Sequence, residues 1–312
     1  MPSTKPISGN IVPYVTLFNH SGNVDYKAMY ALFQATALFV DAAFVGGGTG
    51  QGWMLDPQDL GDIVKLAKGV FNPKPVIAAI WEVPLSCSQP IVRKGEDYAG
   101  VLKARGVDSL VIPPPITETP LGANDILQYY SRIDNLFGDI RKIVYNNPGL
   151  THNPLTLPLS LDIASAVELG GYKDSSGDLG FLDSLLQLSE GWFDVYLGSE
   201  ALAAQLFPDS NYQGKFKGVV GSTGNAAAEF MGELWNAYAQ GNLERSRRLG
   251  DTLLEALPLI NGPSNSEIVQ RLTFALNSAG IGSPDTLYNP ASDAAKGEVI
   301  SGLKMLQDAL KG

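Results

Sequence analysis

The sequence predicts an α/β protein built as a closed (β/α)8 barrel, a TIM barrel, with a C-terminal helical extension. Eight short β-branched or apolar runs alternate with stretches of helical periodicity over most of the chain. These runs are almost continuously apolar, which is typical of parallel strands buried on both faces. No dinucleotide-binding or Walker fingerprint follows the early runs, and this favours a closed barrel over an open, doubly wound sheet.

The strands and helices of the predicted barrel alternate along the chain, with Gly, Pro or Asn turns between them. The strands are Ile11–Leu17, Ala42–Val45, Val76–Ile80, Ser109–Ile112, Lys142–Tyr145, Gly170–Lys173, Val195–Leu197 and Gly218–Val220. The helices are Asp25–Val40, Pro57–Val70, Gln89–Arg105, Ala123–Phe137, Leu159–Leu169, Asp178–Leu188, Glu200–Leu206 and Ala226–Gln240. The second helix has a strong start signal, because Asp56 can cap it and Pro57 suits the first helical position. By the same capping rule, Asp178 is predicted to cap its helix.

Three more helical segments follow the eighth strand–helix unit. They lie near Leu243–Leu257, Ser266–Ser278 and Ala294–Leu310. They predict a helical cap added to the barrel. We therefore divide the 312-residue chain into a barrel over residues 1–240 and a helical extension, packed on the barrel, over residues 241–312.

The composition excludes several classes of protein. Hydrophobic residues make up 45% of the chain and charged residues 17%, whereas a disordered chain combines low hydrophobicity with high charge. Lys and Arg total 22 against 32 Asp and Glu, so the net charge is −10. Such a charge repels phosphate backbones and anionic lipids. We therefore expect neither nucleic acid nor a membrane surface as a partner.

Cysteine and histidine are too scarce for a Cys/His metal site. Cys87 is the only cysteine, and His20 and His152 are the only histidines, so no intrachain disulfide can form and we expect no metal. No secretory signal is visible, and the most apolar stretch, residues 28–40, is too short to cross a bilayer. These features predict a soluble, cytoplasmic protein.

A glycine-rich run, residues 45–53, follows the second predicted strand. Its glycines lack G-x-G-x-x-G spacing, and no P-loop lysine accompanies them. One interpretation is a tight turn, which glycine permits. The other is an anion site, in which backbone N–H groups around Gly48 and the hydroxyl of Thr49 bind a small carboxylate. The second interpretation places a binding site at the C-terminal ends of the strands, where such barrels build their active sites.

Lys173 and Tyr145 each end a predicted strand and are candidates for chemistry. Lysine is almost never fully buried, yet Lys173 ends a strand that should face the packed barrel. It either reaches solvent or Asp174 at the rim, or it is an amine that burial keeps partly neutral and able to form a Schiff base with a keto acid. Tyr145 is either a buried tyrosine with a satisfied hydroxyl or a proton-transfer group tuned by a neighbouring cation.

The loop after the eighth strand argues against hydrolase chemistry. Residues 218–225 are rich in Gly, Ser and Thr but lack the G-x-S-x-G spacing of a nucleophile elbow. Neither histidine of the chain stands in a plausible triad order. A serine hydrolase is therefore not supported.

Several short motifs occur in a specific order along most of the chain. They are Gly9–Pro13, Gly22–Asp25, Gly47–Gln51, Tyr145–Pro148, Gly171–Asp178, Gly198–Ser199 and Gly218–Gly221. In this order and spacing, the chain resembles the class I, Schiff-base-forming, pyruvate-dependent aldolases, which are the dihydrodipicolinate synthase and N-acetylneuraminate lyase family.

The resemblance implies a role for each matched position. Lys173 resembles the lysine that forms the Schiff base, and Tyr145 resembles the tyrosine that transfers protons. Thr49 and the backbone of Gly48 correspond to the site of the keto acid's carboxylate, and Val220 to a backbone carbonyl offered to the substrate. The implied partners are pyruvate, or a related keto acid, and an aldehyde, with no cofactor. The resemblance also implies a homo-oligomer, a tetramer or a dimer.

Three positions depart from the pattern of the family. Gly48 stands where the family has a hydroxyl residue that continues the proton relay from the tyrosine. Pro113–Pro115 stands where dihydrodipicolinate synthases have tyrosines, and Leu150 aligns near their carboxylate-binding arginine. These departures argue against dihydrodipicolinate synthase activity itself. They also predict an apolar substrate cavity with Trp53 and Leu150 in its wall.

Three functions remain open at this point. The first is an aldolase acting on a 2-keto-3-deoxy sugar acid, on 4-hydroxy-2-oxoglutarate or on an aryl-substituted keto acid. The second is a Schiff-base dehydratase or decarboxylase of a 2-keto-3-deoxy sugar acid. The third is a non-catalytic barrel that binds a keto acid, and the absent hydroxyl at Gly48 is the feature that supports it.

Overall fold

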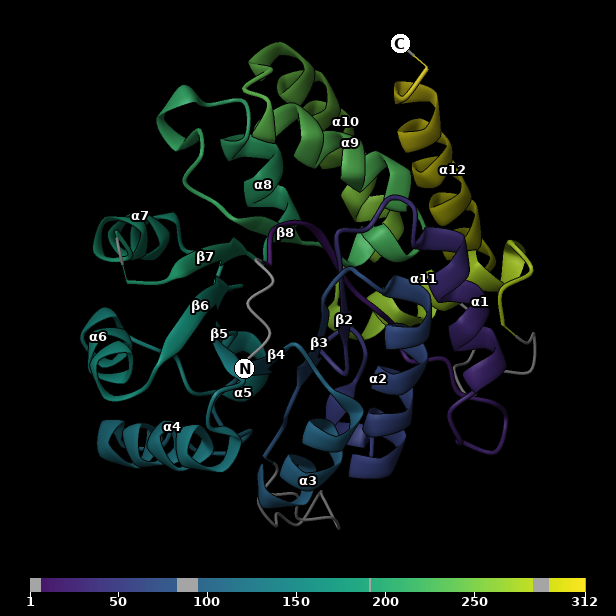
Figure 1. The fold of residues 1–312 in the computed structure, drawn as a ribbon. Coiled ribbons are helices and arrows are strands. Elements are labelled where there is room, and N and C mark those ends of the chain that lie inside the picture. The colour runs from purple at the N-terminus through teal and green to yellow at the C-terminus, as the bar shows by residue number, and fades with distance from the viewer. Residues whose placement is uncertain (1–6, 83–94, 191, 283–291, 312) are drawn as a thin grey trace.

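The structure, a computed structural model, describes residues 7–82, 95–190, 192–282 and 292–311. Cys87 and residues 89–94 of the predicted third helix lie outside this part of the chain. Eight parallel strands pair in chain order, and the first pairs with the last, so the predicted closed barrel is confirmed (Figure 1). The strands are β1 Gly9–Pro13, β2 Ala42–Val45, β3 Val76–Ala79, β4 Ser109–Ile112, β5 Arg141–Asn146, β6 Leu169–Asp174, β7 Asp194–Leu197 and β8 Gly218–Val220.

The first strand differs most from its prediction, since it covers Gly9–Pro13 and not Ile11–Leu17. Pro13 has no backbone N–H, so it cannot donate to a continuing ladder. Beyond it the backbone N–H of Val15 donates to Oδ1 of Asn225 at 3.0 Å, in place of a neighbouring strand. The apolar residues that follow are buried in a loop. A buried loop and a buried strand give the same apolar sequence pattern, so the pattern alone predicted a longer strand.

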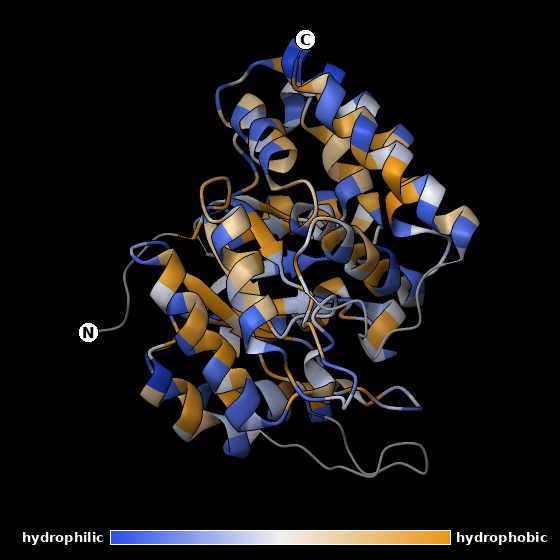
Figure 2. Cartoon of the chain, turned by 90° about the vertical axis from the view of Figure 1, so that its right-hand side faces the viewer, coloured by the Kyte–Doolittle hydropathy of each residue, from blue (hydrophilic) through white to orange (hydrophobic). Residues whose placement is uncertain are grey.

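Helices follow most strands and surround the barrel (Figure 1). They are α1 Tyr26–Thr36, α2 Pro57–Phe71, α3 Gly95–Arg105, α4 Ala123–Phe137, α6 Leu157–Ala166, α7 Leu179–Leu188, α8 Glu200–Leu206 and α9 Ala228–Ala239. A short helix that was not predicted, α5 Pro148–Thr151, follows β5. The predicted caps are confirmed, because Asp56 accepts from the N–H of Asp59 and Asp178 from that of Phe181. The helices carry hydrophobic and hydrophilic residues on different faces (Figure 2).

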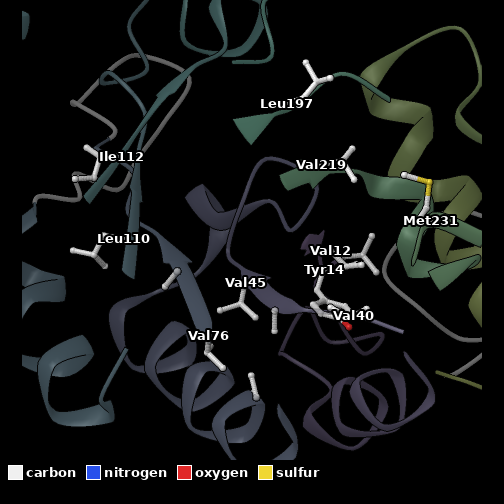
Figure 3. Packing of buried hydrophobic residues seen from close by; sticks show 14 of the residues in the cluster. Val12, Tyr14, Val40, Val45, Val76, Leu110, Ile112, Leu197, Val219 and Met231 are labelled. Carbon is white, nitrogen blue, oxygen red and sulfur yellow. The ribbon is translucent and has the colours of Figure 1, made fainter. Parts of the chain in front are cut away.

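Side-chain alternation along the strands divides the core into two layers. The layer inside the barrel includes Ile11, Phe44, Ile77, Val111, Ile143 and Tyr145. The layer between strands and helices includes their neighbours Val12, Val45, Leu110, Ile112 and Val219 (Figure 3). Tyr145, near the end of β5, belongs to the inner layer, so its side chain faces the barrel interior.

The C-terminal helices are α10 Leu243–Asn261, α11 Asn265–Ser278 and α12 Asp293–Ala309. Helix α10 packs against α8 and α9, and α11 and α12 pack against α10 (Figure 1). Helix α10 approaches α8 closely at Gly250, where an added Cβ would overlap the backbone oxygen of Ala204. No helix in the described ranges is both long enough and apolar enough to cross a membrane.

We expect Gly250→Ala to destabilise the protein by about 1–3 kcal/mol, the usual cost of overpacking. The new methyl group would push α10 away from the rigid backbone at Ala204. The matched control is Gly69→Ala in α2, where an added Cβ meets no atom within 4 Å and the change improves helix propensity. Thermal unfolding measures both variants. Equal melting temperatures would contradict the tight packing of α10 on α8.

Candidate active site

A cavity of about 850 Å³ opens at the C-terminal ends of the strands. This is the end at which (β/α)8 barrels place their active sites. All five site residues predicted from the sequence line it, namely Gly48, Thr49, Tyr145, Lys173 and Val220. Residues from four separate parts of the chain are therefore brought to one cavity.

Lys173 is the next-to-last residue of β6, with only 5% of its surface exposed. Its Nζ lies 3.7 Å from the centroid of the Tyr145 ring and 5.3 Å from that of Phe44. Asp174, its neighbour on the strand, accepts hydrogen bonds from Asn146 at 2.9 Å and Ser176 at 2.8 Å. Successive strand residues point to opposite faces. Lys173 is thus a buried amine among aromatic rings and not a rim lysine.

Tyr145 is the next-to-last residue of β5, lies directly across the ladder from Lys173 and is only 3% exposed. Its hydroxyl accepts a hydrogen bond from Nδ2 of Asn147 at 2.8 Å. Burial raises the pKa of the Tyr145 phenol, but the charge of Lys173 and hydrogen bonds from Asn147, Lys173 and Ser175 outweigh it and lower the pKa below its ordinary value. The geometry supplies the tuning cation that proton transfer by a tyrosine requires.

The glycine-rich loop brings Gly48 and Thr49 to the cavity. The loop is fixed by hydrogen bonds to its carbonyls, from Trp81 Nε1 to Gly46 at 2.7 Å and from Thr16 Oγ1 to Gly50 at 2.6 Å. A Cβ added at Gly48 would lie 3.6 Å from the Tyr145 hydroxyl. At Gly48 the loop therefore presents backbone, rather than a side chain, to the Tyr145 hydroxyl.

Part of the cavity wall is apolar. Trp53 and Leu150, both predicted as wall residues, line the cavity. Helices α10 and α11 add further lining residues, Leu257, Pro258, Asn261, Ile268 and Val269. No sequence pattern predicted this contribution, since these helices are distant along the chain from every strand-end motif.

Glu200, the first residue of α8, also lines the cavity. Its carboxyl accepts hydrogen bonds from the Ser222 hydroxyl and the Thr223 N–H, each at 3.0 Å. Burial raises the pKa of Glu200, although these hydrogen bonds oppose the shift. Glu200 is the only acidic residue in the described lining, as Lys173 is the only Lys or Arg. The strand-end rule could have found it, because it closely follows β7.

Comparisons of sequence and fold identify relatives of this chain. The family model of the Dihydrodipicolinate synthetase family matches residues 6–308. The 4-hydroxy-tetrahydrodipicolinate synthase of Marinobacter nauticus is 25% identical over 303 residues, covering 96% of this chain and 98% of that protein.

Solved structures share the fold. A dihydrodipicolinate synthase from Acinetobacter baumannii, complexed with pyruvate, has a TM-score of 0.82 at 20% identity, covering 96% of this chain and 99% of that one. A catalytic-lysine mutant of the Ruminococcus gnavus sialic acid aldolase has a TM-score of 0.80 at 18% identity, covering 100% of this chain and 99% of that one. With a family match over nearly its whole length, the chain belongs to the dihydrodipicolinate synthetase family of lyases.

Proposed function

We propose that the protein is a class I aldolase that joins pyruvate to an aldehyde, or cleaves the product, through a Schiff base on Lys173. The observation that carries this proposal is the buried Lys173 amine, 3.7 Å from the ring centroid of Tyr145 at the wall of the cavity. A desolvated lysine beside a proton-transfer group is the arrangement that amine catalysis needs.

The reaction begins when the neutral Lys173 amine adds to the ketone carbon of the keto acid. Tyr145 protonates the departing hydroxyl of the carbinolamine, water leaves, and an iminium forms. In the cleavage direction, the Tyr145 phenolate takes the proton of the C4 hydroxyl and the C3–C4 bond breaks to give the aldehyde. The electron pair of that bond forms the enamine double bond, and the iminium π pair moves to nitrogen. Tyr145 then returns the proton to C3 of the enamine. Water adds to the iminium and gives its proton to the phenolate, which releases pyruvate and frees the lysine. Each step needs positioning and one proton transfer.

The keto acid's carboxylate has a proposed site at the glycine-rich loop. The backbone of Gly48 and the Thr49 hydroxyl would supply donors there, and Val220, which lines the cavity from β8, would offer its carbonyl to the substrate. The chain has a net charge of −10, which opposes an anionic substrate, so these local donors and Lys173 must supply the attraction.

We propose that the aldehyde is uncharged. In the described lining, Lys173 is the only cation, and it is used by the Schiff base. A second carboxylate would find no further Lys or Arg in this lining, and burying a charge without a paired cation is costly. The proposal favours a 2-keto-3-deoxy sugar acid or an aryl-substituted keto acid over 4-hydroxy-2-oxoglutarate. It also argues against synthesis of 4-hydroxy-tetrahydrodipicolinate.

Borohydride reduction in the presence of pyruvate tests the Schiff base. We expect a reduced adduct on the peptide that contains Lys173, located by mass spectrometry. No adduct there would contradict the proposal. Product analysis then separates the functions: pyruvate plus an aldehyde supports the aldolase, whereas loss of water or carbon dioxide supports a dehydratase or decarboxylase. An adduct without turnover across a panel of keto acids supports a binding protein.

Leu150→Arg tests the uncharged aldehyde. Leu150 lines the cavity near Gly48, and a guanidinium there could pair with a carboxylate on the aldehyde. We expect the ratio of kcat/KM for glyoxylate to kcat/KM for glyceraldehyde to rise about tenfold. Leu150→Met is the volume-conserving control and should leave the ratio unchanged. A wild-type protein that already prefers glyoxylate would contradict the proposal.

A further inference from the structure

Asn147 has no part in the proposed reaction, yet it lines the cavity and contacts the Tyr145 hydroxyl, the proposed proton-transfer group. Its Nδ2 donates a hydrogen bond to the Tyr145 hydroxyl at 2.8 Å. Its backbone is fixed as the N-cap of α5, where its carbonyl accepts from the N–H groups of Leu150 at 3.1 Å and Thr151 at 3.0 Å. The amide is therefore held against the phenol by the local fold.

The direction of this hydrogen bond has a chemical consequence. A side-chain amide nitrogen only donates, so the phenol oxygen of Tyr145 must accept and its own proton is left for another partner. A hydrogen bond that stabilises the charged form of an acid makes the acid stronger. The amide does not itself pass a proton, so it acts as a fixed donor and not as a relay.

The space on the neighbouring side of the phenol is open to a side chain but contains none. A Cβ at Gly48 would be in ordinary contact with its neighbours, 3.6 Å from the Tyr145 hydroxyl and 3.4 Å from Cδ2 of Leu150. Gly48 is not among the glycines with positive φ, so its backbone accepts other residues. A hydroxyl could stand at residue 48, and the chain instead directs an amide to the phenol from residue 147.

We propose that Asn147 is a positioning residue for proton transfer, holding the Tyr145 hydroxyl in one orientation and stabilising its deprotonated form. The assignment rests on the proposed aldolase function. It agrees with the lowered pKa of Tyr145: burial raises this pKa, but the Lys173 charge and then the Asn147 hydrogen bond lower it. By contrast, burial raises the pKa of other tyrosines such as Tyr129, Tyr130 and Tyr172.

Asn147→Leu removes the hydrogen bond, and Asn147→Asp replaces the donor by a carboxylate of nearly the same shape. Ultraviolet difference titration, with Tyr145→Phe as the reference, follows the ionisation of Tyr145 without any substrate. We expect the midpoint to rise by about one pH unit in Asn147→Leu and by more in Asn147→Asp. The basic limb of the kcat/KM profile should move upward by the same amount. The borohydride-trapped adduct should still form.

A rescue experiment distinguishes this role from a purely structural one. Adding Gly48→Ser to Asn147→Leu places a hydroxyl beside Tyr145, whereas adding Gly48→Ala places only the methyl group. We expect the serine double variant alone to bring the titration midpoint back toward that of the wild type. Equal midpoints in the wild type, Asn147→Leu and Asn147→Asp would overturn the proposal. Because the titration uses no substrate, a missing pyruvate adduct would contradict the aldolase function without deciding the role of Asn147.

Discussion

Replacing Lys173 with methionine is expected to abolish the pyruvate adduct and to lower kcat/KM by at least about three orders of magnitude. Methionine fills a similar volume but has no amine, so neither the carbinolamine nor the iminium can form. The keto acid would still bind at the glycine-rich loop without any electron sink. Borohydride trapping with peptide mapping, together with steady-state kinetics, measures both effects.

The matched control for this prediction is Lys142→Met. Lys142 is also buried, at 3% exposed, but its Nζ pairs with Asp134 at 2.7 Å outside the cavity lining. Its loss should lower the melting temperature and leave the adduct at Lys173 intact. An adduct that persists in Lys173→Met, or one that disappears only in Lys142→Met, would show that the reactive amine has been assigned wrongly.

Replacing Tyr145 with phenylalanine is expected to lower kcat about 10²–10⁴-fold, the range for loss of a general acid–base group. Phenylalanine keeps the ring beside Lys173 and removes only the hydroxyl. The adduct should still be trapped, more slowly, because the amine remains. Single-turnover trapping and steady-state kinetics separate the two effects.

The pH profile gives a second readout for Tyr145. The pKa of Tyr145 is lowered, since the Lys173 charge and the hydrogen bonds outweigh burial, so the phenolate is populated at lower pH than in an ordinary tyrosine. Because the protonated phenol is the acid that iminium formation needs, kcat/KM falls as the pH rises through this pKa. That fall should be absent in Tyr145→Phe.

Tyr172→Phe is the control for Tyr145. Tyr172 is a buried tyrosine of β6 that shares a hydrogen bond of 2.9 Å with Ser160, outside the cavity lining. Its removal should change kcat by less than about twofold, as expected for a side chain that touches no reacting atom. Equal losses in the two variants would mean that the effect at Tyr145 is structural.

Much of the fold was determined by local sequence. The apolar runs at β2, β4 and β8 have the predicted bounds, because strands buried on both faces leave a continuous apolar signal. The helix caps Asp56 and Asp178 were equally local, since each side chain bonds an N–H three residues ahead. Local sequence also identified Lys173 as a candidate, because a charged residue at the end of a buried strand conflicts with its apolar surroundings.

The arrangement around the reacting group was decided only by the tertiary structure. The sequence predicted that Tyr145 and Lys173 end two strands. The distance of 3.7 Å between Nζ of Lys173 and the centroid of the Tyr145 ring depends on the register between β5 and β6. The walls contributed by α10 and α11 come from segments with no local pattern that points to the cavity. Periodicity reports which residues are buried. It does not report which distant residues they are buried against, and the chemistry of this site depends on those contacts.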